Sequence, residues 1–204
     1  MGTFRVLVSG SRKWVDEASV IRGLQFAQKT ARSADPAVQM VLVHGDCPNS
    51  ADRVAARLAQ QAGWALEPHP AVWRPFPDPK RVDKGAGYKR NAEMVALGAD
   101  ITLVFQLERS AGTEHCAIRS VRAGIPTFLV AYREGVLMPT LHVTAENVNV
   151  AFPPKPQTVT GGLAAEEPVA KVYYDTQASV VRCGECNGPD GKHGTKCPTR
   201  LVSA

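Results

Sequence analysis

Three short stretches of this sequence combine glycine with hydroxyl or charged side chains, and each follows an apolar run. They are Gly10-Ser11-Arg12, His44-Gly45-Asp46 and Ser110-Ala111-Gly112-Thr113. Each stands where a strand would end and a helix would begin, so the first backbone N–H groups of the helix are free and lie at the positive end of its dipole. Such a turn suits a phosphate or another anion. Because the three turns are of one kind, we expect them to form a common anion site.

Side chains near these turns complete the expected site. A fourth helix start follows residues 85–87, and Arg12 and Arg90 carry guanidinium groups that can close an anion pocket with forked hydrogen bonds. Carboxylates nearby are acceptors suited to ribose hydroxyls or to the edge of a base. The ligand-binding candidates are Gly10, Ser11, Arg12, Gly45, Asp46, Asp52, Asn91, Ser110, Gly112 and Thr113. The alternative is that each glycine only relieves a tight turn and each charge faces water.

The turns must be positioned by alternating strands and helices. Short runs rich in Val, Leu and Ile predict buried strands, and they cover residues 4–9, 38–43, 64–67, 101–105 and 127–130. Apolar residues at helical spacing predict helices between them, over residues 16–31, 50–62, 88–97 and 113–123. This order predicts an α/β fold, a Rossmann-like, doubly wound parallel sheet covered on both faces. The strand-to-helix turns of such a sheet share one edge, where ligands bind.

Composition and charge narrow the class of partner. The chain has 204 residues, enough for one ordinary domain and an appendage, and a formal net charge of +5. Residues 74–90 hold six Lys/Arg against two Asp/Glu, which would attract an anionic ligand or a nucleic-acid backbone unless they form an ordinary solvated loop. Trp73, just before this segment, is a residue that can stack on a base or serve in packing.

The termini of the sequence carry no membrane signal. No apolar run approaches the roughly 18 residues that span a bilayer, and the apolar stretch near the N-terminus is too short for a signal peptide. We therefore expect a cytoplasmic protein with no membrane partner.

The last part of the chain has a different composition. We expect a domain over residues 1–150, a proline-containing linker over 151–168 and a small tail over 169–204. The tail offers three thiolates and one imidazole at the spacing Cys183-x2-Cys186-x6-His193-x3-Cys197. Such a set takes Zn²⁺ tetrahedrally in a closed, structural site. The alternative is a tail with incidental cysteines.

The motifs resemble a known superfamily. They read VLVSGSRKW, VLVHGDCPNSADRVAARLA, GAGYKRNAEMVALGAD and SAGTEHCAIRSVRAGIP. In this order they look like the YspA-type (cpYpsA-related) branch of the SLOG superfamily, which also holds the LOG phosphoribohydrolases and the DprA/Smf recombination mediators. The resemblance spans residues 4–131. It implies a Rossmann-like domain that binds a nucleotide or a nucleotide-derived ligand at the turns named above, and domains of this superfamily often form homodimers.

The resemblance leaves the activity open. The LOG enzymes carry a PGGxGT motif with a glutamate shortly after it, for cleavage of an N-glycosidic bond, whereas this chain has SAGT followed by Glu114, His115 and Cys116. Glu93, together with Arg90, is the more credible catalytic pair here. A phosphoribohydrolase-like hydrolase is compatible with these residues, and binding without turnover, as in a sensor, fits equally well.

Two further resemblances bear on partners. The terminal cluster is similar to a CCHC zinc knuckle, but its spacing differs and no aromatic residue lies between Cys183 and Cys197. Knuckles that bind single strands stack bases on an aromatic, so we expect a stabilising clip or a protein-contact module. The alternative to a small-nucleotide site is a single-stranded nucleic-acid binder like DprA/Smf, and the localised charge favours the small nucleotide.

Overall fold

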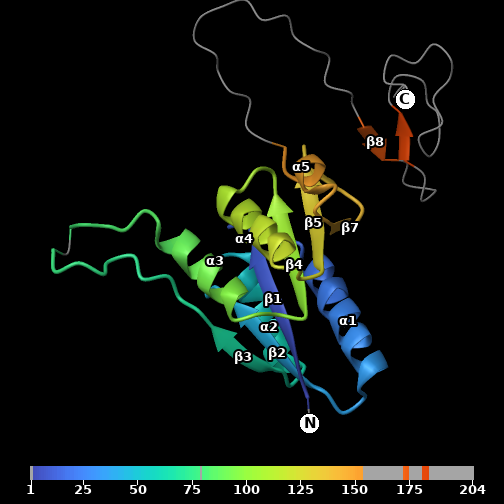
Figure 1. The fold of residues 1–204 in the computed structure, drawn as a ribbon, viewed down its shortest axis with the longest axis horizontal. Coiled ribbons are helices and arrows are strands. Elements are labelled where there is room, and N and C mark those ends of the chain that lie inside the picture. The colour runs from blue at the N-terminus through green and yellow to red at the C-terminus, as the bar shows by residue number, and fades with distance from the viewer. Residues whose placement is uncertain (1, 79, 154–171, 175–180, 184–204) are drawn as a thin grey trace, which may run out of the picture. The chain divides into compact units, whose positions relative to one another are not determined.

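The computed structural model describes residues 2–78, 80–153, 172–174 and 181–183. Five strands of its main sheet run parallel in the order β3-β2-β1-β4-β5 (Figure 1). They are β1 (Thr3–Gly10), β2 (Gln39–His44), β3 (Ala65–Pro68), β4 (Ile101–Leu107) and β5 (Thr127–Arg133). The expected α/β fold with a mostly parallel, Rossmann-like sheet is confirmed.

Helices cover both faces of the sheet. They are α1 (Glu17–Ala34), α2 (Ala51–Gln61), α3 (Ala86–Ala96) and α4 (Ala111–Arg122). Val6 and Val8 of β1 pack in one core cluster with residues of α1 and α2, whereas Leu7 packs in another with residues of α3 and α4. Successive side chains of a strand point to opposite faces, so a strand covered on both sides must be apolar at every position. This explains the unbroken apolar runs in the sequence.

The strand order reverses beside β1. The chain passes from β1 to β2 and β3 on one side, and then returns to place β4 and β5 on the other side of β1. The carboxyl ends of β1 and β4 therefore flank the point where the winding changes direction, which is where open α/β sheets bind ligands. The turns after both strands contain predicted ligand-binding residues.

Short elements that the sequence pattern did not reveal complete the edge of the sheet. Two strands, β6 (Val136–Leu137) and β7 (Leu141–Val143), pair antiparallel with β5. The helix α5 (Val148–Ala151) follows, and Phe152 behind it is buried in the core between β4, β5 and α4. Elements of two to four residues are too short to show a period.

The chain divides into two units, Met1–Pro154 and Lys155–Ala204. In the second unit the structure describes an antiparallel pair of strands, β8 (Val172–Tyr174) and β9 (Val181–Cys183). The first residues of the expected linker over 151–168 belong to the first unit, since Ala151 ends α5 and Phe152 is buried in the core. Residues 154–168 and most of the expected zinc-binding tail lie outside the described residues, so the rest of the linker and the tail stay predictions. Among the described residues there is no helix with the length and apolar character needed to span a membrane.

A close approach of α2 to β1 at Gly10 gives a stability prediction. A Cβ atom on Gly10 would overlap the Cβ of Ala51 and lie 3.2 Å from the carbonyl oxygen of Phe105. We expect Gly10→Ala to lower the free energy of unfolding by about 1–3 kcal/mol, measured by urea denaturation.

The control for this substitution is Gly112→Ala, since nothing lies within 4 Å of the added atom there. Its expected effect is below ~0.5 kcal/mol. Equal losses for the two variants would contradict the close packing of α2 on β1.

Candidate functional site

The turns after β1 and β2 are joined by one buried carboxylate. Asp52, in the first turn of α2, accepts the Gly10 N–H at Oδ1 and the Gly45 N–H at Oδ2, both at 3.1 Å. Burial raises the pKa of Asp52 to about 6, although the nearby Arg90 and the backbone N–H groups oppose this shift. Both oxygens therefore hold backbone donors, and Asp52 acts here as a positioning residue rather than as a free acceptor.

Arg90 holds the turn after β2 from the α3 side. Its Nη1 donates to the carbonyl oxygens of Gly45 and of His69, the latter at 3.1 Å, and its Nε donates to Oδ1 of Asn91 at 3.0 Å. A Cβ atom on Gly45 would overlap the guanidinium group. A side chain at position 45 would therefore displace the Arg90 guanidinium from its hydrogen bonds to Gly45 and His69.

Asn91 and Ser11 likewise hold backbone segments in place, at the start of α4 and at the end of β4. The buried Asn91 donates from Nδ2 to the carbonyl oxygen of Gly112 at 2.9 Å, which ties α3 to the first turn of α4. Ser11 donates its N–H to the carbonyl oxygen of Phe105 at 2.8 Å, and its Oγ accepts the N–H of Leu107 at 3.0 Å. These bonds extend the pairing of β1 and β4 beyond the last strand residue.

The start of α4 is left available for a ligand. Ser110, at the N-cap position, makes no side-chain hydrogen bond to the helix backbone, and its Oγ lies 2.9 Å from Oγ1 of Thr113 instead. The first N–H groups of a helix have no acceptor within the helix. They therefore present donors and the positive end of the α4 dipole to the space in front of Gly112.

A cleft of about 450 Å³ opens at this edge of the sheet. It collects most of the residues that the sequence predicts, namely Gly10, Ser11, Arg12, Asp52, Arg90, Asn91, Ser110, Gly112 and Thr113. Three helix starts and the reversal of strand order meet there. Four basic side chains line the cleft against a single acidic one, Asp52; they are Arg12, Lys84, Arg90 and Arg109.

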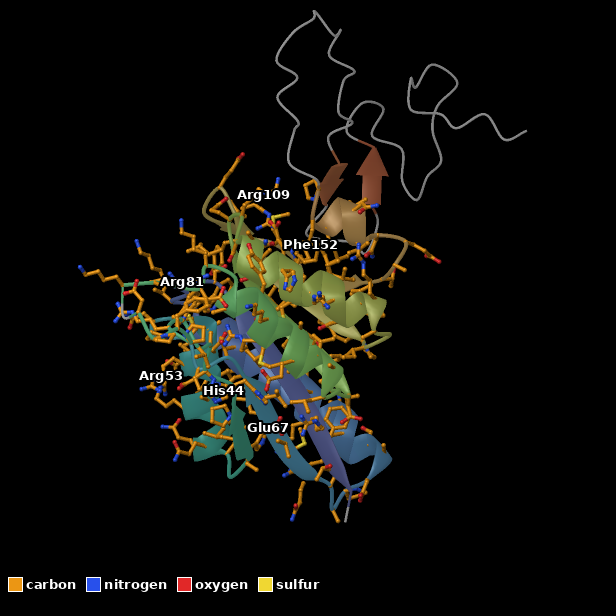
Figure 2. All side chains as sticks on the ribbon, turned by 60° about the vertical axis from the view of Figure 1, so that its left-hand side comes forward. His44, Arg53, Glu67, Arg81, Arg109 and Phe152 are labelled. Carbon is orange, nitrogen blue, oxygen red and sulfur yellow. The ribbon has the colours of Figure 1, made fainter. Side chains whose placement is uncertain are left out.

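The remaining predicted residues lie elsewhere. Gly45 is behind the Arg90 guanidinium. Asp46 lines a separate hollow that involves α2 and β3, where its Oδ1 lies 3.4 Å from Nη1 of Arg53 (Figure 2). The side chain of Glu93 is 64% exposed, and its Oε1 lies 3.6 Å from Nδ1 of His69. The structure therefore places Arg90 at the cleft and its expected partner Glu93 outside it.

Arg109, Tyr88 and Lys84 are among the cleft residues that were not sequence candidates. Arg109 directly precedes Ser110, Tyr88 lies three residues before Asn91 on the same face of α3, and Lys84 belongs to the basic segment. The helical spacing of Tyr88 and Asn91 was the signal that could have found the tyrosine. Trp73, considered for stacking, also lines the cleft.

Glu114 points away from the cleft and supports Arg109. Its Oε1 accepts from Nε2 of the buried Gln106 at 3.0 Å, and its two oxygens lie 3.4 Å from Nε and Nη2 of Arg109. Arg109 also donates to the carbonyl oxygen of Pro153 at 2.6 Å. In Figure 2 Arg109 lies toward the same end of the unit as Phe152. Within the described parts of the chain, no group of three or more His, Cys, Asp or Glu is arranged to hold a metal.

The chain is thus an α/β protein with a mostly parallel sheet and a cleft with basic side chains at the point where the strand order reverses. The profile of the YspA, cpYpsA-related SLOG family matches residues 4–76. The chain is also similar to Gene 61 protein of Mycobacterium phage D29, with 41% identity over 127 residues, which cover 60% of this chain and 92% of that protein. The chain belongs to the YspA, cpYpsA-related SLOG family, as its motifs predict. No solved structure matches it.

The double acceptor role of Asp52 gives a prediction for stability and its pH dependence. Asp52→Asn keeps one acceptor oxygen and turns an NH₂ group toward a backbone N–H, so we expect a loss of about 1–3 kcal/mol at pH 7. The folded pKa of about 6 lies above the unfolded value of 3.8, so between these values the folded chain binds a proton more readily than the unfolded chain. Ionisation of Asp52 therefore lowers the stability of the wild type as the pH rises through this window.

Asparagine does not titrate, so the wild type and Asp52→Asn are compared by urea denaturation at a series of pH values. The difference in their free energies of unfolding should widen as the pH falls from about 6 to about 4, and stay constant above about 7. A difference that narrows on acidification would mean that the fold favours the ionised carboxylate.

Proposed function

We propose that the cleft binds a nucleotide or a nucleotide-derived ligand through its phosphate. One observation carries the proposal: Arg12 and Lys84 line the same cleft as the open start of α4, and neither makes a side-chain hydrogen bond or ion pair to any other described residue. Unpaired cations beside free helix N–H groups favour a phosphate strongly. Family membership supports a nucleotide-related ligand.

The other polar groups suggest a division of roles. The hydroxyls of Ser110 and Thr113 are at the start of α4, where they can accompany the helix N–H groups toward a phosphate. Arg109 adds a third cation, positioned by Glu114. Asp52, Arg90 and Asn91 hold the backbone, and we assign them to keeping these groups in place.

The arrangement favours binding over turnover. Cleavage of an N-glycosidic bond needs an acid or base within hydrogen-bond reach of the base or the ribose. Glu93, the acid considered for catalysis, is outside the cleft, and Asp52, the acid that lines it, already accepts two backbone donors. We therefore favour a sensor or carrier of the nucleotide. The enzymatic alternative with Arg90 and Glu93 is tested by release of free base from a nucleoside monophosphate.

The phosphate role of the two free cations is tested by calorimetry with adenosine 5′-monophosphate. Arg12→Ala and Lys84→Ala should each weaken binding roughly tenfold, because each removes a charge-assisted contact. Arg53→Ala is the matched control, since Arg53 is an exposed cation that pairs with Asp46 away from the cleft. An effect of Arg53→Ala equal to that of Arg12→Ala would point to diffuse charge instead of a site.

Titrations at several salt concentrations distinguish the proposed nucleotide site from the alternative, a single-stranded nucleic-acid binder. Binding of a mononucleotide should lose little affinity with added salt, whereas an oligonucleotide that neutralises many cations loses affinity steeply. No binding of any nucleoside monophosphate, together with tight and salt-sensitive binding of an oligonucleotide, would replace the present proposal by that alternative.

We also propose that Cys183, Cys186, His193 and Cys197 hold one structural Zn²⁺. The support is the residue types and their spacing in the sequence; of the four, Cys183 is the one that falls within the described residues, as the last residue of β9.

Metal analysis of the full chain tests the zinc proposal. We expect about one zinc per chain, a content that Cys186→Ser and Cys197→Ser abolish and that Cys47→Ser leaves unchanged, since Cys47 belongs to the nucleotide cleft. Zinc content near zero in the wild type would refute the proposal.

A further inference from the structure

The cleft is lined by two aromatic side chains in addition to its basic ones. Trp73 and Tyr88 both line it, and each side chain is 43% exposed. The other two tryptophans, Trp14 and Trp64, are only 4% and 7% exposed and pack in the core. A half-exposed aromatic pair in a concave site presents apolar faces to a ligand instead of to the core.

Trp73 is held at the cleft by a loop that is closed at its base. The N–H of Asp83 donates to the carbonyl oxygen of Trp73 at 2.8 Å, so residues 73–83 form a closed excursion between β3 and α3, visible as the projecting loop in Figure 1. Asp83 is fixed in turn, because its Oδ1 accepts the Gly85 N–H at 2.9 Å and its Oδ2 pairs with Nζ of Lys89 at 2.8 Å. The position of Trp73 therefore depends on the first turn of α3.

A glycine on α3 makes room for the indole. A Cβ atom on Gly87 would lie 3.5 Å from Cη2 of Trp73, which is ordinary van der Waals contact, so the ring already lies against the helix backbone. Tyr88 follows directly and is steadied by an edge-to-face contact with His115 at 4.7 Å between ring centroids. Both aromatic side chains of the cleft are thus held in place by contacts with the protein, Trp73 by Gly87 and Tyr88 by His115.

We propose that Trp73 is a base-stacking platform that makes the cleft selective for phosphates carrying an aromatic base. The inference rests on the proposed nucleotide function, and it assigns the base of the nucleotide to the aromatic residues of the cleft. In this proposal the basic side chains and the start of α4 bind the phosphate. The base stacks on the indole of Trp73, with Tyr88 beside it. A cleft of about 450 Å³ is sized for a small molecule, so the ligand is a mononucleotide or a nucleotide derivative rather than a nucleic-acid strand.

The selectivity is tested by comparing adenosine 5′-monophosphate with ribose 5-phosphate, which lacks the base. Stacking on an aromatic side chain contributes about 1–3 kcal/mol per base, so Trp73→Ala should weaken binding of the nucleotide about 5- to 150-fold. The same variant should leave the affinity for ribose 5-phosphate within about twofold of the wild type, because Trp73 makes no phosphate contact in this proposal. Trp73→Phe keeps an aromatic face and should retain most of the nucleotide affinity.

Gly87 supplies a matched pair of variants that leave the indole intact. Gly87→Ala adds an atom at contact distance from Trp73 and should bind like the wild type. The methyl groups of Gly87→Val extend past that distance and displace the ring, so this variant should weaken binding of the nucleotide and not of ribose 5-phosphate.

Fluorescence gives a readout independent of affinity. Since Trp14 and Trp64 are buried, acrylamide quenching of the wild type reports mainly Trp73. Adenosine 5′-monophosphate should protect this fluorescence from quenching, whereas saturating ribose 5-phosphate should not.

The outcomes separate this inference from the function beneath it. If the nucleotide binds and Trp73→Ala changes neither affinity nor selectivity, the platform is wrong and the nucleotide site stands. If neither phosphate binds the wild type, both proposals are wrong. Binding of a single-stranded oligonucleotide more tightly than the mononucleotide, with equal dependence on Trp73, would also overturn the inference, because the platform would then serve a nucleic-acid strand.

Discussion

The carboxylate of Asp52 is the interaction on which the cleft depends. It lies in the first turn of α2 and accepts the N–H groups of Gly10 and Gly45, so one side chain ties the start of α2 to the ends of the neighbouring strands β1 and β2. A buried carboxylate is costly to ionise, as its raised pKa of about 6 shows. The two backbone hydrogen bonds and the nearby Arg90 offset that cost. Removal of any one of these partners would leave the buried carboxylate with an incompletely compensated charge.

Several polar side chains around the cleft hold the surrounding backbone in place, and their hydrogen-bonding groups are thereby used within the protein. Arg90 holds the Gly45 turn, Asn91 joins α3 to the start of α4, and Ser11 prolongs the pairing of β1 with β4. The groups that remain free are of two kinds, namely cations and helix N–H groups on the one hand and the aromatic rings of Trp73 and Tyr88 on the other. This division is what suggests a ligand with a charged end and an aromatic end.

Residue types in the sequence predicted the positions of the turns well but predicted the roles of the charged side chains poorly. Glycine beside a hydroxyl residue after an apolar run correctly predicted where strands end and helices begin, because backbone constraints at such turns act locally. The roles of charged residues depend on which long-range partner each one finds. Asp52 was considered as an acceptor for ribose hydroxyls or a base edge, and in the structure its carboxylate accepts the N–H groups of Gly10 and Gly45. Glu93 lies near His69 outside the cleft. Lys84 was expected only as part of the basic segment 74–90, and Arg109, which directly precedes the Ser110 turn, was not singled out because a lone arginine beside a turn is usually an exposed surface residue.

The sequence by itself determined the alternation of strands and helices, the parallel sheet and the family, since buried strands need unbroken apolar runs and helices need a 3.6-residue period. It also located the turns that meet at the carboxyl edge. Only the tertiary structure decided which side chains face the cleft. The β3–α3 loop brings Trp73 to the cleft through the hydrogen bond between Asp83 and Trp73, and Asp52 bridges strands that are far apart in sequence. Such contacts depend on long-range packing, for which local sequence patterns carry no signal.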